Sequence, residues 1–147
     1  MPNFTHSFIV DAPLEKVRAF HGDTAALKKL SPPLMFVQLH DVEPLAEGST
    51  ADFTLWFGPL PIRWQAIHHN VTNFGFTDVQ ARGPAKLWRH THTFTPISAG
   101  RTRVDDVVEF EHHEGWRGLL TRFFFSRLNL LVLFTFRKWR TRRGILS

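Results

Sequence analysis

Alternation of apolar and polar residues dominates the first three quarters of the chain. Runs in which every second residue is apolar predict β-strands, because successive side chains of a strand point to opposite faces. Gly, Pro and Asn separate the runs at short, regular intervals, which is typical of an antiparallel meander. The pattern predicts strands at Phe4–Val10, Leu34–Val42, Ser49–Phe57, Ile62–His69, Phe74–Ala81, Lys86–Thr95 and Thr102–Glu111.

Two short helices are predicted between the first and second strands. Pro13 suits the first turn of a helix, where a missing N–H group costs nothing, and the apolar stripe after it continues to about His21. Asp23 or Thr24 can cap a second helix. Ser31-Pro32-Pro33 then stops that helix, because proline cannot continue it.

The last part of the chain, from about Gly115 to Arg143, predicts one long amphipathic helix. At about 100° per residue, one broad face, expected to be buried, collects Trp116, Leu120, Phe123, Phe124, Leu128, Leu131 and Phe134. Arg127 falls close to this face. Arg122, Ser126, Arg127 and Asn129 interrupt the apolar stretch before it reaches the roughly 18 clean residues that a membrane span needs.

The order of elements predicts an α+β fold in a single domain, residues 1–147. One face of an antiparallel sheet must be buried, and the terminal helix is the only predicted element large enough to cover seven strands. We therefore expect a curved seven-stranded antiparallel sheet wrapped around a long C-terminal helix, with both short helices after the first strand.

Polar residues occupy inward positions on three of the predicted strands. Asp78 and Gln80 share a strand face with Phe76. His90 and His92 share a face with Trp88 and Phe94, and Asp106 is in phase with Val104, Val108 and Phe110. Buried polar groups require partners, so these side chains are expected to form one network, with Arg127 as a further member.

At this point the chain resembles the helix-grip proteins of the START, Bet v 1 and polyketide cyclase superfamily (SRPBCC), and within it a branch of small bacterial ligand-binding proteins often labelled cyclase/dehydrase. The matching residues are Ala12-Pro13 with Val17, Phe20 and His21; Leu30-Ser31-Pro32-Pro33; Trp64; Phe76 with Asp78, Gln80, Gly83-Pro84, Trp88, His90, His92 and Phe94; Thr102 with Asp106, Val108 and Phe110; and Phe134 with Phe136-Arg137.

The resemblance implies a deep cavity between sheet and helix that holds an apolar or aromatic molecule, with no established reaction for this branch. The chain departs from the branch at Ala85, where relatives tend to have a large aromatic residue, and at Phe110 and Phe136, where they have Tyr. These changes would enlarge or dry the interior. The expected ligand-binding residues are Trp64, Phe76, Asp78, Gln80, Trp88, His90, His92, Phe94, Asp106, Phe110, Phe124, Arg127 and Leu131.

The inward polar cluster has three interpretations at this stage. It could be structural, since a satisfied network fixes strand register. It could orient a ligand that carries a carboxylate, phenol or carbonyl. It could also be catalytic, with His90 or His92 as a general acid or base oriented by Asp106 or Asp78. Two imidazoles on one strand face beside a carboxylate also permit a metal site, but we predict no metal and no cofactor.

Composition narrows the remaining choices. The chain contains no Cys, which excludes disulfides, thiolate metal sites and Cys nucleophiles. The N-terminus lacks the pattern of a signal peptide, so a cytoplasmic location is expected.

The net charge of +5 is concentrated near the C-terminus, in Arg137, Lys138, Arg140, Arg142 and Arg143. This cluster is either a solvated helix end or a contact for membrane or RNA. No DNA partner is expected. His68-His69 and His112-His113 fall near strand ends and are expected at the surface.

Together these observations favour a protein that binds a hydrophobic small molecule, such as a lipid, an isoprenoid or an aromatic polyketide-like compound, in an internal cavity. The alternative is a cyclase or dehydratase that uses His90 or His92. A third hypothesis is an interaction module that docks on membrane or RNA through its basic helix end.

Overall fold

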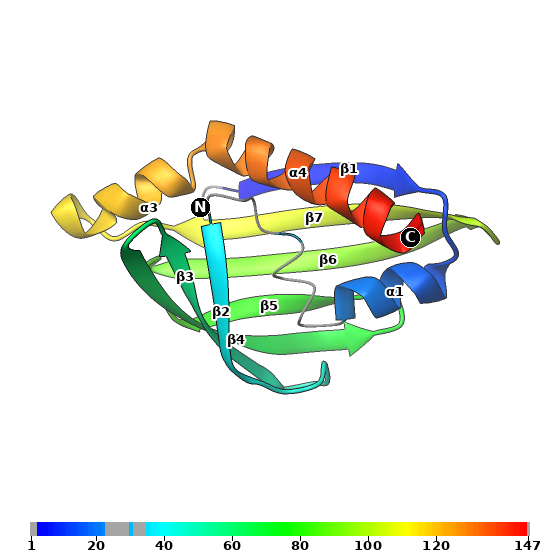
Figure 1. Cartoon of the computed structure of the whole chain (residues 1–147), viewed down its shortest axis with the longest axis horizontal. Coiled ribbons are helices and arrows are strands. Elements are labelled where there is room, and N and C mark those ends of the chain that lie inside the picture. Colours follow the sequence, from blue (N-terminus) through cyan, green and yellow to red (C-terminus); the bar gives the residue numbers. More distant parts are fainter. Residues whose placement is uncertain (1–2, 23–29, 31–34, 147) are drawn as a thin grey trace.

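The computed structural model describes residues 3–22, 30 and 35–146, and its centre is one antiparallel sheet of seven strands (Figure 1). The strands are β1 (Asn3–Val10), β2 (Met35–Val42), β3 (Thr50–Phe57), β4 (Leu60–Thr72), β5 (Gly75–Arg82), β6 (Leu87–Ser98) and β7 (Arg101–Glu111). Their order in the sheet is β1-β7-β6-β5-β4-β3-β2. The predicted α+β helix-grip fold, with its curved sheet and long C-terminal helix, is confirmed.

The boundary between β3 and β4 differs from the prediction, because the turn between them is shorter than its proline residues suggest. Gly58-Pro59-Leu60-Pro61 was expected to be a turn, but β4 already begins at Leu60. Leu60 pairs with Phe57 and Pro61 with Trp56, so only two residues connect β3 to β4. Gly58 has φ of 59°, a conformation that glycine adopts without steric cost.

The first predicted helix is α1 (Leu14–Gly22). The second, expected to start at Asp23 or Thr24, falls outside the described residues. The single helix predicted from Gly115 is wrong: the segment consists of the 3-10 turn η1 (Gly115–Gly118), α3 (Leu119–Phe124) and α4 (Arg127–Leu146).

Ser126 explains the break in the C-terminal segment. Its hydroxyl accepts a hydrogen bond from the Asn129 N–H at 3.3 Å, and its carbonyl accepts one from Leu130 at 2.9 Å, which starts a new helix. Just before it, Phe125 leaves the helical conformation with φ of −107° and ψ of 27°. Asn129 also donates its side-chain N–H to the Phe123 carbonyl, which joins the two helices.

Because the helix restarts at Arg127, the face predicted to be buried is mostly wrong. Phe134 is buried and Phe124 is half-buried, but the other members of that face are exposed: Trp116, Leu120, Phe123, Leu128 and Leu131. The buried positions of α3 and α4 are Thr121, Leu130, Phe134 and Thr141.

Helix α4 lies across the β1 edge of the sheet, and its C-terminal end approaches α1 (Figure 1). The Phe134 ring packs on Phe4 of β1 with centroids 5.4 Å apart. Two buried apolar clusters fill the space between sheet and helices. The first gathers around Trp64, Trp88, Phe110, Leu130 and Phe134, and the second around Phe8, Val17, Phe76, Phe94 and Val104.

Candidate functional site

A row of polar side chains crosses the inner face of the sheet between the two apolar clusters. On β6, His90 and His92 lie between Trp88 of the first cluster and Phe94 of the second. On β7, Asp106 lies between Val104 and Val108, which belong to different clusters. We call His68, Asp78, His90, His92 and Asp106 the polar row; all but Asp78, which is half-buried, are buried.

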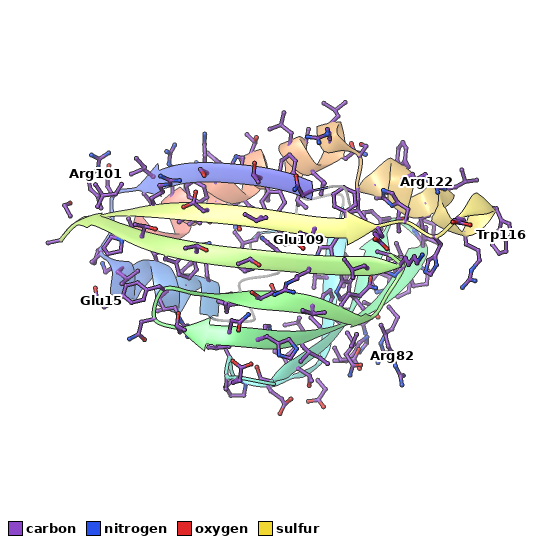
Figure 2. All side chains as sticks on the ribbon, turned by 180° about the vertical axis from the view of Figure 1, so that it is seen from behind. Glu15, Arg82, Arg101, Glu109, Trp116 and Arg122 are labelled. Carbon is purple, nitrogen blue, oxygen red and sulfur yellow. The ribbon has the colours of Figure 1, made fainter. Side chains whose placement is uncertain are left out.

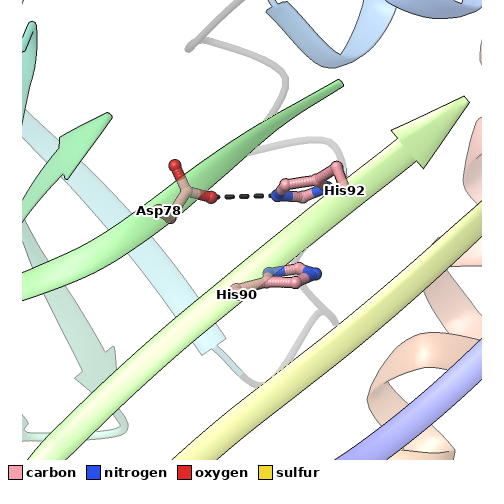
Figure 3. A group of neighbouring side chains, drawn as sticks. All are labelled: Asp78, His90 and His92. Carbon is pink, nitrogen blue, oxygen red and sulfur yellow. Dashed lines mark hydrogen bonds and ion pairs between the residues drawn. The ribbon is translucent and has the colours of Figure 1, made fainter. Parts of the chain in front are cut away.

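The strand register explains which members of the polar row meet. Asp78 on β5 is directly opposite His90, and Asp106 on β7 is directly opposite His92. The hydrogen bonds run along the diagonals instead. His92 Nε2 donates to Asp78 Oδ2 at 2.9 Å (Figure 3), and His90 Nε2 donates to Asp106 Oδ1 at 2.8 Å. Diagonal neighbours across strands are within reach of long side chains. The two diagonals bind β5, β6 and β7 together.

A glycine allows β5 to approach β6 at this point. Gly75 has φ of 148°, and a Cβ atom there would lie 2.0 Å from the backbone oxygen of His92. No other residue type fits without moving the backbone that carries His92. Gly75 therefore helps to set the distance between Asp78 and His92.

His68 extends the polar row onto β4 and was missed by the expectation that it lies at the surface. Its Nε2 lies 3.0 Å from Asp78 Oδ1, and its Nδ1 accepts from the Ser49 hydroxyl at 3.0 Å. The strand continues to Thr72, so the inward phase set by Ile62, Trp64 and Ala66 reaches His68. That alternation was visible in the sequence and could have placed the residue.

Burial and hydrogen bonding drive the two histidines of β6 to opposite protonation states. Burial lowers the pKa of His90 to about 4, and the charge on His92 acts in the same direction. Burial alone would also lower the pKa of His92, but hydrogen bonds and Coulomb attraction from Asp106 and Asp78 outweigh it and raise the pKa to about 9. At neutral pH, therefore, His92 is a cation and His90 is neutral.

The two carboxylates stay ionised. Burial on its own would raise the pKa of Asp78, but hydrogen bonds from His68 and His92 hold it well below its usual range. The pKa of Asp106 is held low in the same way by His90 and His92. The polar row thus places two carboxylates beside the cation of His92, with neutral His90 as a further hydrogen-bond donor.

A cavity of about 160 Å³ lies between the concave face of the sheet, which carries the polar row, and the helices α1 and α4. Most of its wall is apolar, from Leu39, Phe53, Leu55, Trp64, Trp88, Phe125 and Leu133. The polar lining comes from His21, His68, Asp78, His90, His92 and Arg137. The site is an apolar chamber with polar groups along one side, the usual build of a small-molecule pocket.

Six of the thirteen residues expected to bind ligand line this cavity: Trp64, Phe76, Asp78, Trp88, His90 and His92. Three others do not line the cavity. Asp106 accepts a hydrogen bond from His90, and Phe94 and Phe110 are packed in the two apolar clusters. Phe124 lines a smaller hollow of about 10 Å³ beside the first cavity and stacks on Phe57 at 4.1 Å.

Gln80, Arg127 and Leu131 lie elsewhere than expected. Gln80 closes the turn after β5, with its amide nitrogen donating to the Ala85 carbonyl at 2.8 Å and its oxygen accepting from the Ala85 N–H. Arg127 and Leu131 are exposed: Arg127 is the first residue of α4, and Leu131 lies to the side of the face that Leu130 and Phe134 bury. The arginine on the cavity wall is Arg137.

His21 also reaches the cavity, with its ring 5.0 Å from Phe94 and 6.2 Å from His92. Its Nδ1 donates to the Val17 carbonyl at 3.0 Å, and burial lowers its pKa to about 4. His21 is therefore a neutral residue of the cavity wall, and its hydrogen bond to Val17 fixes its ring on α1.

Asp78, His90 and His92 offer donor atoms within 4.8 Å of one another, which is a possible metal-ligand set (Figure 3). Two imidazoles and a carboxylate suit several divalent metals. However, the Nε2 atoms of both histidines already donate to carboxylates. A metal would have to replace those hydrogen bonds and the proton of His92.

Comparison with known proteins adds to this geometry. Residues 1–129 match the model of a family described as polyketide cyclase/dehydrase and lipid transport. The chain belongs to this family. No curated protein matches the sequence significantly. The description of the family thus includes the transport of lipids, which are hydrophobic ligands.

Solved structures with the same fold cover nearly the whole chain. A protein from Chromobacterium violaceum is similar with a TM-score of 0.76 and 16% identity, over 97% of this chain and 96% of that one. A START superfamily protein from Mycobacterium smegmatis has a TM-score of 0.72 and 10% identity, over 97% and 96%. The Zhui aromatase/cyclase from Streptomyces sp. R1128 has a TM-score of 0.66 and 14% identity, over 99% and 91%.

The charge on His92 gives a pH-dependent stability. Its pKa is raised from 6.5 to about 9, so its contribution to the free energy of unfolding is complete below pH 6.5 and disappears as the pH rises to about 9. We expect the difference in unfolding free energy between the wild type and His92→Gln to narrow across that window, as measured by urea denaturation. Exposed His69→Gln is the matched control. A difference that stays constant or widens would contradict the assignment.

Proposed function

We propose that the protein binds a hydrophobic small molecule in the cavity beneath the sheet. The observation that supports this most directly is the composition of the cavity wall, which is aromatic and aliphatic around Trp64, Trp88 and Leu133 and polar along the row and at His21 and Arg137. An apolar guest would remove this wall from water, while the row would orient any polar group it carries. Membership of a family with a hydrophobic ligand-binding fold supports the same function.

The size of the cavity favours a compact ligand. An engineered apolar cavity of roughly 150 Å³ in another protein holds one benzene ring, and the cavity here is about 160 Å³. A single-ring aromatic or a small isoprenoid would fit without rearrangement. A lipid chain or a multi-ring polyketide would require wall residues such as Phe125 or Leu133 to move.

A cyclase or dehydratase activity is the second candidate, and the paired histidines favour it. Environments that push two titratable groups apart supply an acid and a base at one pH. His92 would be the acid and neutral His90, whose ring lies 3.8 Å from that of His92, would be the base. Asp106 would hold His90 in the tautomer that leaves Nδ1 free to accept a proton.

A cavity-filling substitution tests the binding function. Ala66 is buried on the cavity wall, and Ala66→Phe would place a ring in the space for the ligand. Native mass spectrometry of wild type from its own host should show an apolar adduct, and Ala66→Phe should lose it. Ala81→Phe, at an exposed position of the same sheet, is the control and should keep it. An adduct equally abundant in all three proteins would place the ligand elsewhere.

The enzymatic candidate makes a different prediction. His90→Gln keeps a hydrogen-bond donor near Asp106 but removes the base. If the protein is a dehydratase, this variant should bind a β-hydroxyketone substrate as tightly as wild type does. Its turnover should be slower by roughly a hundredfold or more, which is the scale of general base catalysis. Unchanged turnover, followed by absorbance of the enone product, would rule out His90 as the base.

A further inference from the structure

Arg137 is a cation on the cavity wall with no ionic partner in the described part of the chain. It extends from α4 into the cavity beside the polar row. Its Nε atom is buried and has no hydrogen-bond partner, and its guanidinium makes no ion pair with residues 3–22, 30 or 35–146. Its one close aromatic contact is the Phe134 ring, 5.3 Å from the guanidinium carbon.

The neighbouring carboxylates are already occupied. Asp78 accepts from His68 and His92, and Asp106 accepts from His90 and lies 3.3 Å from His92 Nδ1. Burial lowers the pKa of Arg137, opposed by the charges of Asp106 and Asp78, but a guanidinium stays protonated in proteins. A half-buried cation without an ionic partner costs free energy, because it has lost part of its hydration. An anion that binds beside it in the cavity would offset that cost.

We propose that Arg137 binds an acidic head group of the ligand, a carboxylate, while the apolar body of the ligand lies against Trp64 and Trp88. The planar guanidinium presents paired N–H donors that match the two oxygens of a carboxylate. This inference rests on the proposed function, and it defines the ligand class as a small apolar acid.

Titration calorimetry with benzoate and its neutral analogue benzamide tests the role of Arg137. Both have one ring and fit the cavity, but only benzoate is charged. Wild type should bind benzoate more tightly than benzamide. Arg137→Gln should weaken benzoate roughly tenfold or more, the usual scale for a charge-assisted hydrogen bond, with little effect on benzamide. Arg127→Gln, at an exposed position of the same helix, should bind both as wild type does.

The outcomes separate this inference from the proposed function. Equal binding of both probes by wild type would overturn the acidic head group and leave apolar binding intact. No binding of either would contradict both. The empty protein supplies a second readout: Arg137→Met should raise the melting temperature, since it removes an unpaired buried charge, and Arg127→Met should not. A lower melting temperature for Arg137→Met would show a structural role and overturn the inference.

A second feature, independent of the cavity, is the apolar outer face of the C-terminal segment. Side chains at one end include Trp116, 81% exposed, and Phe123, 68% exposed. Trp116 projects past the end of the sheet, near Arg122 (Figure 2). Along α4 the exposed stripe consists of Leu128, Leu131, Val132 and Trp139, spaced three, one and seven residues apart on one side of the helix. Apolar patches of this kind mark contact surfaces.

The charges around this face identify the kind of contact. Residues 115–147 contain eight of the 18 lysines and arginines and none of the 13 acidic residues. Two copies meeting through this face would bring like charges together. An anionic lipid surface would meet both features, since cationic amphipathic helices lie in the interface with their apolar side toward the acyl chains.

We infer that η1, α3 and α4 dock the protein on anionic membranes without crossing them. The segment is not one continuous helix, since it is broken between α3 and α4. By length and composition alone, Gly115–Ile145 suffices to span a bilayer, and only 17% of its most apolar window is buried in the protein. That small share includes Leu130 and Phe134, which belong to the core beneath the sheet. A helix that packs into the core on one side can lie on a membrane with its other side. A carrier in this position could exchange an apolar ligand with the membrane.

Vesicle co-sedimentation tests the docking. The protein should bind mixed phosphatidylcholine–phosphatidylglycerol vesicles and bind pure phosphatidylcholine much more weakly. Phe123→Glu with Leu128→Glu should abolish binding, while Phe74→Glu, at an exposed aromatic on the turn before β5, should not affect it. Binding to neither vesicle, or equal loss in Phe74→Glu, would overturn the inference, as would salt-sensitive RNA binding without vesicle binding.

Discussion

The two diagonal His–Asp hydrogen bonds of the polar row are the interaction on which the site depends. They form only if β5, β6 and β7 keep the register that sets Asp78 opposite His90 and His92 opposite Asp106. A shift of one residue would turn every inward side chain outward. The row also divides the apolar interior in two, so that one cluster completes the core beside α1 and the other borders the cavity. Fold stability and pocket polarity therefore share Asp78, His90 and His92, with Asp106 holding His90 in place.

The second constraint is the break in the C-terminal segment. Because Ser126 ends one helix and caps the next, α4 turns Leu130, Phe134 and Arg137 inward and leaves Arg127 and Leu128 outside. The new helix thus brings Arg137 to the cavity wall and leaves its opposite face exposed. The basic helix end expected from the sequence divides accordingly, with Arg137 belonging to the cavity and Arg143 to the surface.

Strand alternation was sufficient to predict the sheet and the inward phase of Asp78, His90, His92 and Asp106, because side-chain direction in a strand has a period of two. It could not show that the hydrogen bonds are diagonal, since that depends on the register. The helix wheel failed for Arg127 because that residue lies in the first turn of α4, and for Leu131 because the buried face is narrower than the broad face expected from the sequence. The break itself was not predicted, since Ser126 was counted only as a polar interruption. Arg137 was missed because a cluster of arginines at a helix end normally belongs to solvent.

The central claim is that a small apolar molecule occupies the cavity between the curved sheet with its polar row and the helices α1 and α4. Isotope-filtered nuclear Overhauser spectroscopy with toluene and isotope-labelled protein tests it most directly. We predict contacts from the toluene ring to the methyl groups of Leu55 and Leu133 and to the Trp88 indole, all on the cavity wall. Contacts confined to the exposed methyl groups of Leu128 and Val132, or no contacts at saturating toluene, would contradict the claim.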